Sequence, residues 1–321
     1  MTKSFSRVFL AGIAVVTCAL AFGAARAQAP VEPTPPGKRV AIVVGNADYR
    51  SPGLADLGNA ARDGAAVAER LERLNFTVFH ATDVTRAGLE EVVARAESEL
   101  DDAGALVLYF SGHGFQLDQE NYLVPVDFDA TTKAEAATDA LPLSALVERL
   151  SDRDRPLLIF LDACRNSPLP ASVAGADRAN GLAQVEVGEN VFVAFATRPG
   201  MVSYDGGESL KSRLSPFTHA LVKYIEQPEI DVFDMAIQVR NETEALTIGR
   251  QSPWNQDSLL QQFYFTEQQE IDPQLLLAGL SAIESDPVRW DRFRREQQAN
   301  PSSLQALVMA FVSEMNEEAP E

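Results

Sequence analysis

The chain has 321 residues, and 46% of them are hydrophobic, which is enough to bury the core of one large domain with a small addition. Its 46 acidic residues outnumber the 27 basic ones and give a formal net charge of −19 at pH 7. Nucleic acids and anionic membrane surfaces are bound through clustered lysine and arginine side chains. The charge balance therefore argues against both classes of partner.

The first 27 residues have the pattern of a secretory signal peptide. Lys3 and Arg7 form a positively charged start, residues 8–22 are apolar, and Ala-Arg-Ala at 25–27 is a cleavage signal. The apolar run is shorter than the roughly 20 residues that a membrane span needs, so we expect cleavage rather than a retained anchor. The pattern predicts an exported protein, periplasmic or secreted, with no membrane attachment once the leader is removed.

Cleavage would leave one cysteine, Cys164, because the other is Cys18 in the leader. No disulfide within the mature chain is then available, although an exported chain meets an oxidising compartment. A single cysteine is usually a small apolar filler of the core. The polar neighbours Asp162, Arg165 and Asn166 favour a reactive thiol instead.

Residues 28–37 are rich in proline and are expected to be an extended linker. From residue 39 onward, apolar runs typical of strands alternate with segments of helical periodicity. The expected strands are 40–44, 76–80, 105–110, 121–125, 157–161, 191–196 and 259–265, and the expected helices are 60–74, 89–100, 143–150, 215–225 and 231–246. This order is typical of an α/β fold with a mainly parallel six-stranded sheet and helices on both faces.

The composition changes after Thr266. Three pairs there, Asp272-Pro273, Asp286-Pro287 and Asn300-Pro301, each join a capping residue to a proline suited to the first helical position. We expect two or three short helices and an acidic tail. The chain then divides into a signal peptide (1–27), a linker (28–37), a main domain (38–266) and a helical C-terminal region (267–321).

Two short segments at strand ends carry groups suited to catalysis. Ser-Gly-His-Gly at 111–114 follows the strand 105–110, and Asp-Ala-Cys at 162–164 follows the strand 157–161. Open α/β sheets place their chemistry at the carboxyl ends of their strands, and a thiol beside a base is the core of covalent acyl transfer. A free thiol has a pKa near 8.5, so it needs a neighbouring imidazole to take its proton at neutral pH.

A metal site is not indicated, since the three histidines and the single mature cysteine lack the spacing of ligands. His80 and His219 are expected to have structural or surface roles. A cysteine-dependent phosphatase would need an arginine six positions after the cysteine, and that position is Pro170.

The two strand-and-motif segments and their separation resemble the caspase-like cysteine peptidases, and among them the metacaspases and bacterial orthocaspases more than the animal caspases. Residues 196–206 resemble the loop that builds the primary specificity pocket of this family. Gly45-Asn46, Tyr49 and the segment 59–63 also fit. The likeness covers residues 39–265 and implies a caspase-like fold.

By this resemblance Cys164 is the nucleophile and His113 the general base, and the main-chain N–H groups of Gly114 and Cys164 form the oxyanion hole. The chemistry needs no cofactor. Calcium activation is common among metacaspases, but no ligand set can be mapped here. The resemblance also implies a monomer.

The specificity pocket departs from that of animal caspases, in which a glutamine and arginines select aspartate. Here Asp162 stands two positions before the nucleophile, Asp205 corresponds to one arginine, and Asp56 falls close to the other. The inverted charge predicts protein or peptide substrates with arginine or lysine before the scissile bond (P1), and rejection of aspartate by repulsion. By the resemblance Ser111 adds a hydrogen bond.

Residues 167–189 show no periodicity and are expected to form an exposed loop, where family members are often cut during maturation. Arg178 is its best basic site, so self-cleavage after Arg178 is a hypothesis. Two alternatives stay open: a non-catalytic caspase-like binding or scaffold protein, and an esterase or amidase acting on small molecules. The acidic pocket does not favour the second.

Overall fold

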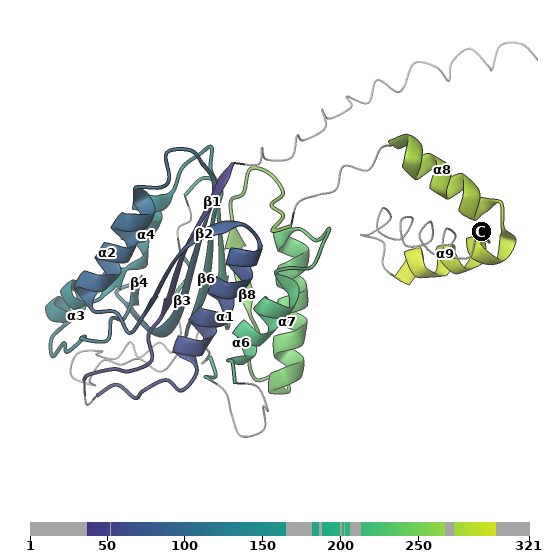
Figure 1. Cartoon of the computed structure of the whole chain (residues 1–321). Coiled ribbons are helices and arrows are strands. Elements are labelled where there is room, and N and C mark those ends of the chain that lie inside the picture. The colour runs from purple at the N-terminus through teal and green to yellow at the C-terminus, as the bar shows by residue number, and fades with distance from the viewer. Residues whose placement is uncertain are drawn as a thin grey trace, which may run out of the picture. The chain divides into compact units, whose positions relative to one another are not determined.

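The computed structural model describes residues 37–51, 53–164, 182–185, 188–199, 201, 203–205, 213–266 and 273–299 (Figure 1). The side chains of Cys164 and of residues 273–277 and 296–299 lie outside the described part. So do the predicted signal peptide, most of the predicted linker, Arg178 and the third predicted C-terminal helix.

The described strands form one mixed sheet whose main path runs β2-β1-β3-β6-β7-β8. The strands are β1 Lys38–Gly45, β2 Phe76–Thr82, β3 Ala103–Leu117, β4 Glu120–Leu123, β5 Leu141–Pro142, β6 Leu157–Cys164, β7 Val191–Phe195 and β8 Trp254–Asp257. All pairings along the path are parallel except that of β8 with β7, and β4 and β5 add an antiparallel extension at the end of β3. The predicted mainly parallel sheet is confirmed: its main path has six strands, and β4 and β5 bring the total to eight.

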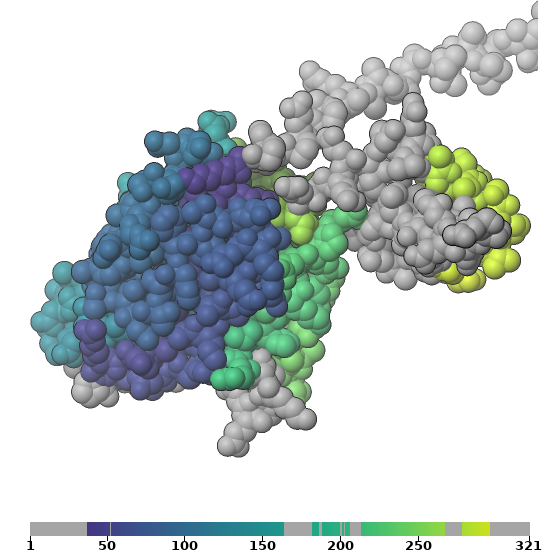
Figure 2. Space-filling model, in the orientation of Figure 1, coloured from purple at the N-terminus to yellow at the C-terminus, as the bar shows by residue number. Residues whose placement is uncertain are grey.

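Helices cover both faces of the sheet (Figure 1). The helices of the described residues are α1 Ala60–Arg73, α2 Arg86–Glu97, α3 Lys133–Asp139, α4 Leu143–Leu150, α6 Pro216–Tyr224, α7 Val232–Thr247, α8 Pro273–Glu284 and α9 Pro287–Ala299, of which α1, α2, α4, α6 and α7 pack on the sheet. Apolar side chains of α2 and α4 pack on one face, and those of α1, α6 and α7 pack on the other. In the space-filling view α1 and the α6–α7 pair form a continuous surface (Figure 2).

Several helix boundaries follow from capping residues that the sequence displays. The hydroxyl of Ser215 accepts a hydrogen bond from the Thr218 N–H at 3.0 Å, and Pro216 is the first residue of α6. Asp231 accepts from the N–H groups of Phe233 and Asp234 at the start of α7. The helices α8 and α9 begin at the expected prolines and lie against each other, with Ile283 and Phe293 buried. None of the described helices is long and apolar enough to cross a membrane.

The predicted last strand at 259–265 is wrong. The edge strand is β8, at Trp254–Asp257, and its polar sequence hid it because an edge strand is only partly buried. In the segment 259–265, one isolated bridge joins Tyr264 to Asp231. The apolar alternation of this segment comes from Phe263 and Phe265. Both residues are buried in the core, and the centroids of their rings are 5.1 Å apart.

One glycine limits how β1 meets α1. A Cβ atom on Gly45 would lie 2.4 Å from the main-chain oxygen of Ala60, so the end of β1 can approach the start of α1 only without a side chain. Gly53, in the loop between them, has open space around it, with the nearest atom 3.8 Å from an added Cβ.

We predict that Gly45→Ala lowers the free energy of unfolding by about 2 kcal/mol or more, because backbone must move to relieve the clash. Gly53→Ala is the matched control and is expected to change it by less than about 0.5 kcal/mol, as at other unconstrained surface positions. Urea denaturation of both variants measures the difference. Equal stability of the two variants would contradict the close β1–α1 approach.

Candidate active site at the carboxyl ends of β3 and β6

The carboxyl end of β6 lies beside residues 111–114 of β3, which continues beyond them to Leu117, so this motif lies within the strand and not after it as expected. Ser111 pairs with Asp162, and after an irregularity in the register Gly114 pairs with Cys164. His113 therefore lies on the strand next to the one that ends at Cys164, and both residues lie at the same end of these parallel strands. The main chain of Cys164 ends β6, and its side chain lies outside the described part.

The imidazole of His113 is buried and its orientation defines its chemistry. Nε2 lies 2.8 Å from the main-chain oxygen of Ala55. A carbonyl oxygen only accepts hydrogen bonds, so Nε2 must carry a proton. In the neutral ring Nδ1, which is also buried, is then the basic nitrogen.

The two glycines that flank His113 are required by close contacts. A Cβ on Gly112 would lie 2.8 Å from the hydroxyl of Tyr49 and from the ring of Phe110. A Cβ on Gly114 would lie 2.9 Å from the oxygen of Ala163. Neither glycine has a positive φ. Tight packing, and not a left-handed backbone, is thus the reason for glycine at both positions.

Asp162 is fully buried and accepts three hydrogen bonds from hydroxyl groups. Its donors are Ser203 at 2.9 Å, Thr218 at 3.2 Å, and Ser215. The hydroxyl of Tyr109 lies 2.5 Å from that of Thr218; because the Thr218 proton goes to Asp162, Tyr109 is the donor of this second bond. In the described residues Asp162 forms no ion pair, so its donors are neutral.

A second buried carboxylate, Asp63 of α1, joins this cluster and was not assigned from the sequence. It accepts a hydrogen bond from the Ser215 N–H at 2.9 Å and one from the Ser111 hydroxyl at 3.3 Å. Ser215 therefore bridges Asp63 and Asp162. A signal was present, since Asp63 falls on the same face of α1 as Ala60, which is a buried face.

The two carboxylates make the cluster electronegative. Burial raises the pKa of the Tyr109 hydroxyl well above its ordinary value, and the charges of Asp63 and Asp162 raise it further. The sequence prediction that Asp162 and Ser111 belong to one acidic site is therefore consistent with their positions around Asp63.

The structure brings the other two predicted pocket carboxylates into different surroundings. Asp56 is exposed, and its Oδ1 accepts a hydrogen bond from the Tyr49 N–H at 3.0 Å. In the described residues no hydrogen bond or ion pair joins Asp56 to Asp162. Asp205 is half-buried, and its main-chain oxygen accepts a hydrogen bond from the Asn59 side chain.

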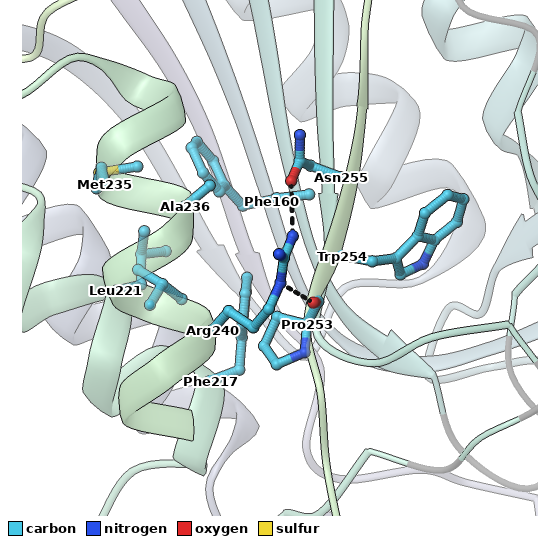
Figure 3. Close-up of a pocket in the computed structure, with 11 residues that line it drawn as sticks. Phe160, Phe217, Leu221, Met235, Ala236, Arg240, Pro253, Trp254 and Asn255 are labelled. Atoms are coloured by element: carbon cyan, nitrogen blue, oxygen red, sulfur yellow. Dashed lines mark hydrogen bonds between the residues drawn. The ribbon is translucent and has the colours of Figure 1, made fainter. Parts of the chain in front are cut away.

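The described residues hold no group of three or more histidine, cysteine, aspartate and glutamate side chains that is arranged to bind a metal ion. A small pocket lies elsewhere, between α6–α7 and the strands β7–β8, and is lined by Phe217, Leu221 and Met235 among others (Figure 3). Arg240 crosses it, donating to the oxygens of Pro253 (2.8 Å) and Asn255 (3.2 Å). The remaining space of about 10 Å³ has room for one water molecule, so this pocket is not a substrate site.

We predict that Ser215→Ala lowers the free energy of unfolding by about 3 kcal/mol, since it removes a helix cap and a hydrogen bond to a buried carboxylate. Thr85→Ala is the control: Thr85 caps α2 through the Gly88 N–H, and its loss is expected to cost about 1 kcal/mol. Urea denaturation measures both. An equal loss in the two variants would show that the bond to Asp162 adds no stability.

Comparisons with known proteins show the family of the chain. Human mucosa-associated lymphoid tissue lymphoma translocation protein 1 is 27% identical over 128 residues, which is 40% of this chain and 15% of that protein. The chain therefore spans only a small part of that relative's length. The peptidase family model described as the caspase domain matches residues 38–264, which include the strands of the sheet, His113 and Cys164. The chain belongs to the caspase-domain family of peptidases.

Proposed function

We propose that the protein is a cysteine endopeptidase that cuts peptide bonds after arginine or lysine, with Cys164 as the nucleophile and His113 as the base. The observation that supports this most is the position of His113 on the strand beside Cys164, with its Nε2 on the Ala55 oxygen at 2.8 Å. This contact makes Nδ1 the basic nitrogen. Family membership supports the reaction class.

The proposed reaction starts when Nδ1 of His113 takes the proton of the Cys164 thiol. The thiolate attacks the substrate carbonyl carbon, and the N–H groups of Gly114 and Cys164 stabilise the negative oxygen of the tetrahedral intermediate. The C–N bond breaks as the imidazolium gives its proton to the leaving amine, and a thioester stays on Cys164. Water, deprotonated by His113, then hydrolyses the thioester and regenerates the thiol. Whenever the ring carries the extra proton, the Ala55 oxygen accepts the Nε2–H hydrogen bond and stabilises the positive charge.

The preference for a basic side chain is supported by the carboxylate cluster. Asp162 and Asp63 are fully buried, and Ser215 connects them. A guanidinium or ammonium group that reaches this cluster supplies a positive charge to Asp162, whose described donors are neutral hydroxyl groups, whereas an aspartate would be repelled. We add Asp63 to the predicted pocket residues Asp162 and Ser111. Asp205 keeps its predicted role as a residue of the specificity pocket.

The proposal includes export through the predicted leader and action as a monomer in the periplasm or outside the cell. The substrates are then proteins or peptides in that compartment. Calcium dependence is left out of the mechanism, since no step of it needs a metal ion.

The first test compares fluorogenic peptides that end in Arg, Lys or Asp before the reporter group. We expect turnover of the Arg and Lys peptides, and loss of activity to background in Cys164→Ala and His113→Ala. Asp162→Asn is expected to lower kcat/KM for the Arg peptide about 100-fold, because a buried charge pair is lost. Asp48→Asn, which changes an exposed carboxylate of the β1–α1 loop, is the control.

A preference for the Asp peptide would overturn the pocket assignment and leave the catalytic pair standing. The rate of Cys164 alkylation near neutral pH addresses the alternative of a non-catalytic scaffold. A thiol that reacts no faster than free cysteine, together with no turnover of any peptide, would favour the scaffold.

The second test concerns self-cleavage after Arg178. Residues 182–185 fall within the predicted exposed loop 167–189, but they are anchored, which corrects that part of the prediction. Leu182 is buried, Ala183 exchanges two hydrogen bonds with Asn121, at 2.7 and 2.9 Å, and the Val185 N–H donates to Gln256 at 2.8 Å. We therefore expect two fragments that separate under denaturing conditions but elute together from a native size-exclusion column.

The new amino terminus should be Ala179. Arg178→Ala is expected to abolish both fragments, and Cys164→Ala should do the same. Identical fragments from the Arg178→Ala protein would discard this site.

A further inference from the structure

The loop between β1 and α1, residues 46–59, contacts His113 through two of its residues. Ala55 accepts the hydrogen bond from Nε2 described above. The hydroxyl of Tyr49 accepts a hydrogen bond from the main-chain N–H of His113 at 2.7 Å. The ring of Tyr49 also meets the imidazole edge to face, with centroids 4.6 Å apart. Tyr49 therefore contacts both the main chain and the side chain of His113.

The irregularity in β3 explains why His113 needs this partner. The register between β3 and β6 shifts between Ser111 and Gly114, which takes His113 out of the regular ladder. His113 is only 7% exposed, and a buried N–H without an acceptor is costly. The Tyr49 hydroxyl supplies the acceptor. It also occupies the space that a Cβ on Gly112 would need.

Asp56 in turn holds Tyr49. Its Oδ1 accepts the hydrogen bond from the Tyr49 N–H at 3.0 Å, and the Leu57 N–H donates to the Ala47 oxygen at 3.0 Å, so the loop closes on itself. Asp56 is the neighbour of Ala55, and the same closure therefore fixes the oxygen that Nε2 contacts. The Tyr49 N–H needs only an oxygen acceptor from the side chain at position 56. The negative charge of Asp56 is not required for this hydrogen bond.

We propose that Tyr49 is a positioning residue for His113, and that Asp56 is a positioning residue that acts through Tyr49. This replaces the substrate-binding role predicted for Asp56, and it rests on the proposed function of His113 as the base. The loop orients the imidazole through a phenol hydroxyl and a main-chain oxygen, so that Nδ1 keeps the direction in which it serves as base.

Tyr49→Phe tests the first part, since it keeps the ring and removes the hydroxyl. We expect kcat for the Arg peptide to fall about 10- to 100-fold, because a misplaced base loses catalytic efficiency steeply. KM should stay within about threefold of the wild-type value, since no group that contacts the substrate has changed. The pH dependence of Cys164 alkylation should shift with it, a readout that general loss of stability does not move.

Asp56→Asn and Asp56→Ala test the second part as a matched pair. Asparagine keeps the oxygen acceptor and removes the charge, so Asp56→Asn should retain kcat within about threefold, while Asp56→Ala should lose about as much as Tyr49→Phe. Asp48→Ala, which removes an exposed carboxylate from the same loop, is the control. An equal rise in KM for the Arg peptide in both Asp56 variants would overturn the proposal in favour of charge recognition by Asp56.

His113→Ala separates failure of this inference from failure of the proposed function. If the alkylation profile of Cys164 is the same in wild type and His113→Ala, His113 is not the base and the proposed function fails. If His113→Ala changes the profile and Tyr49→Phe changes neither it nor kcat, the positioning role alone is overturned. The Asp56 pair decides the question in the same way should Tyr49→Phe not fold.

Discussion

The close approach of β3 to the carboxyl end of β6 is the constraint on which the site depends. Gly114 lies opposite Cys164, and a Cβ there would meet the Ala163 oxygen at 2.9 Å, so any side chain would push the two strands apart. The strands come close at the point where the register of the β3–β6 pairing becomes irregular, just before Gly114. That irregularity removes the His113 N–H from the ladder, and Tyr49 accepts it instead. A packing requirement between two strands thus makes the β1–α1 loop part of the site.

The buried carboxylates reduce the stability that the core would otherwise have. Moving a carboxylate from water into the interior costs several kcal/mol, and apolar residues of similar volume are often at least as stable. The hydroxyls of Ser203, Ser215 and Thr218 offset this cost for Asp162. Stability therefore does not account for this acidic cluster, and the proposed recognition of a basic substrate side chain gives it a role.

The sequence predicts the elements of the core better than the relations between them. Apolar runs such as 40–44 and 157–161 identify buried strands because such strands have apolar side chains on both faces, and Ser215-Pro216 marks the start of α6. The edge strand β8 lacks that signal. Asp63 was missed because its partners are 48 residues away at Ser111 and 152 residues away at Ser215. For Asp56, the sequence shows a carboxylate near the pocket motifs but not that a main-chain N–H already uses it.

The site draws on residues on both sides of the predicted loop that contains Arg178. His113 and Asp162 precede this loop, while Ser215 and Thr218, which hold Asp162, follow it. The parallel pairing of β6 with β7 joins the two sides, and so do the hydrogen bonds between Asn121 and Ala183. A cut within the loop therefore leaves the carboxylate cluster and the surroundings of His113 assembled.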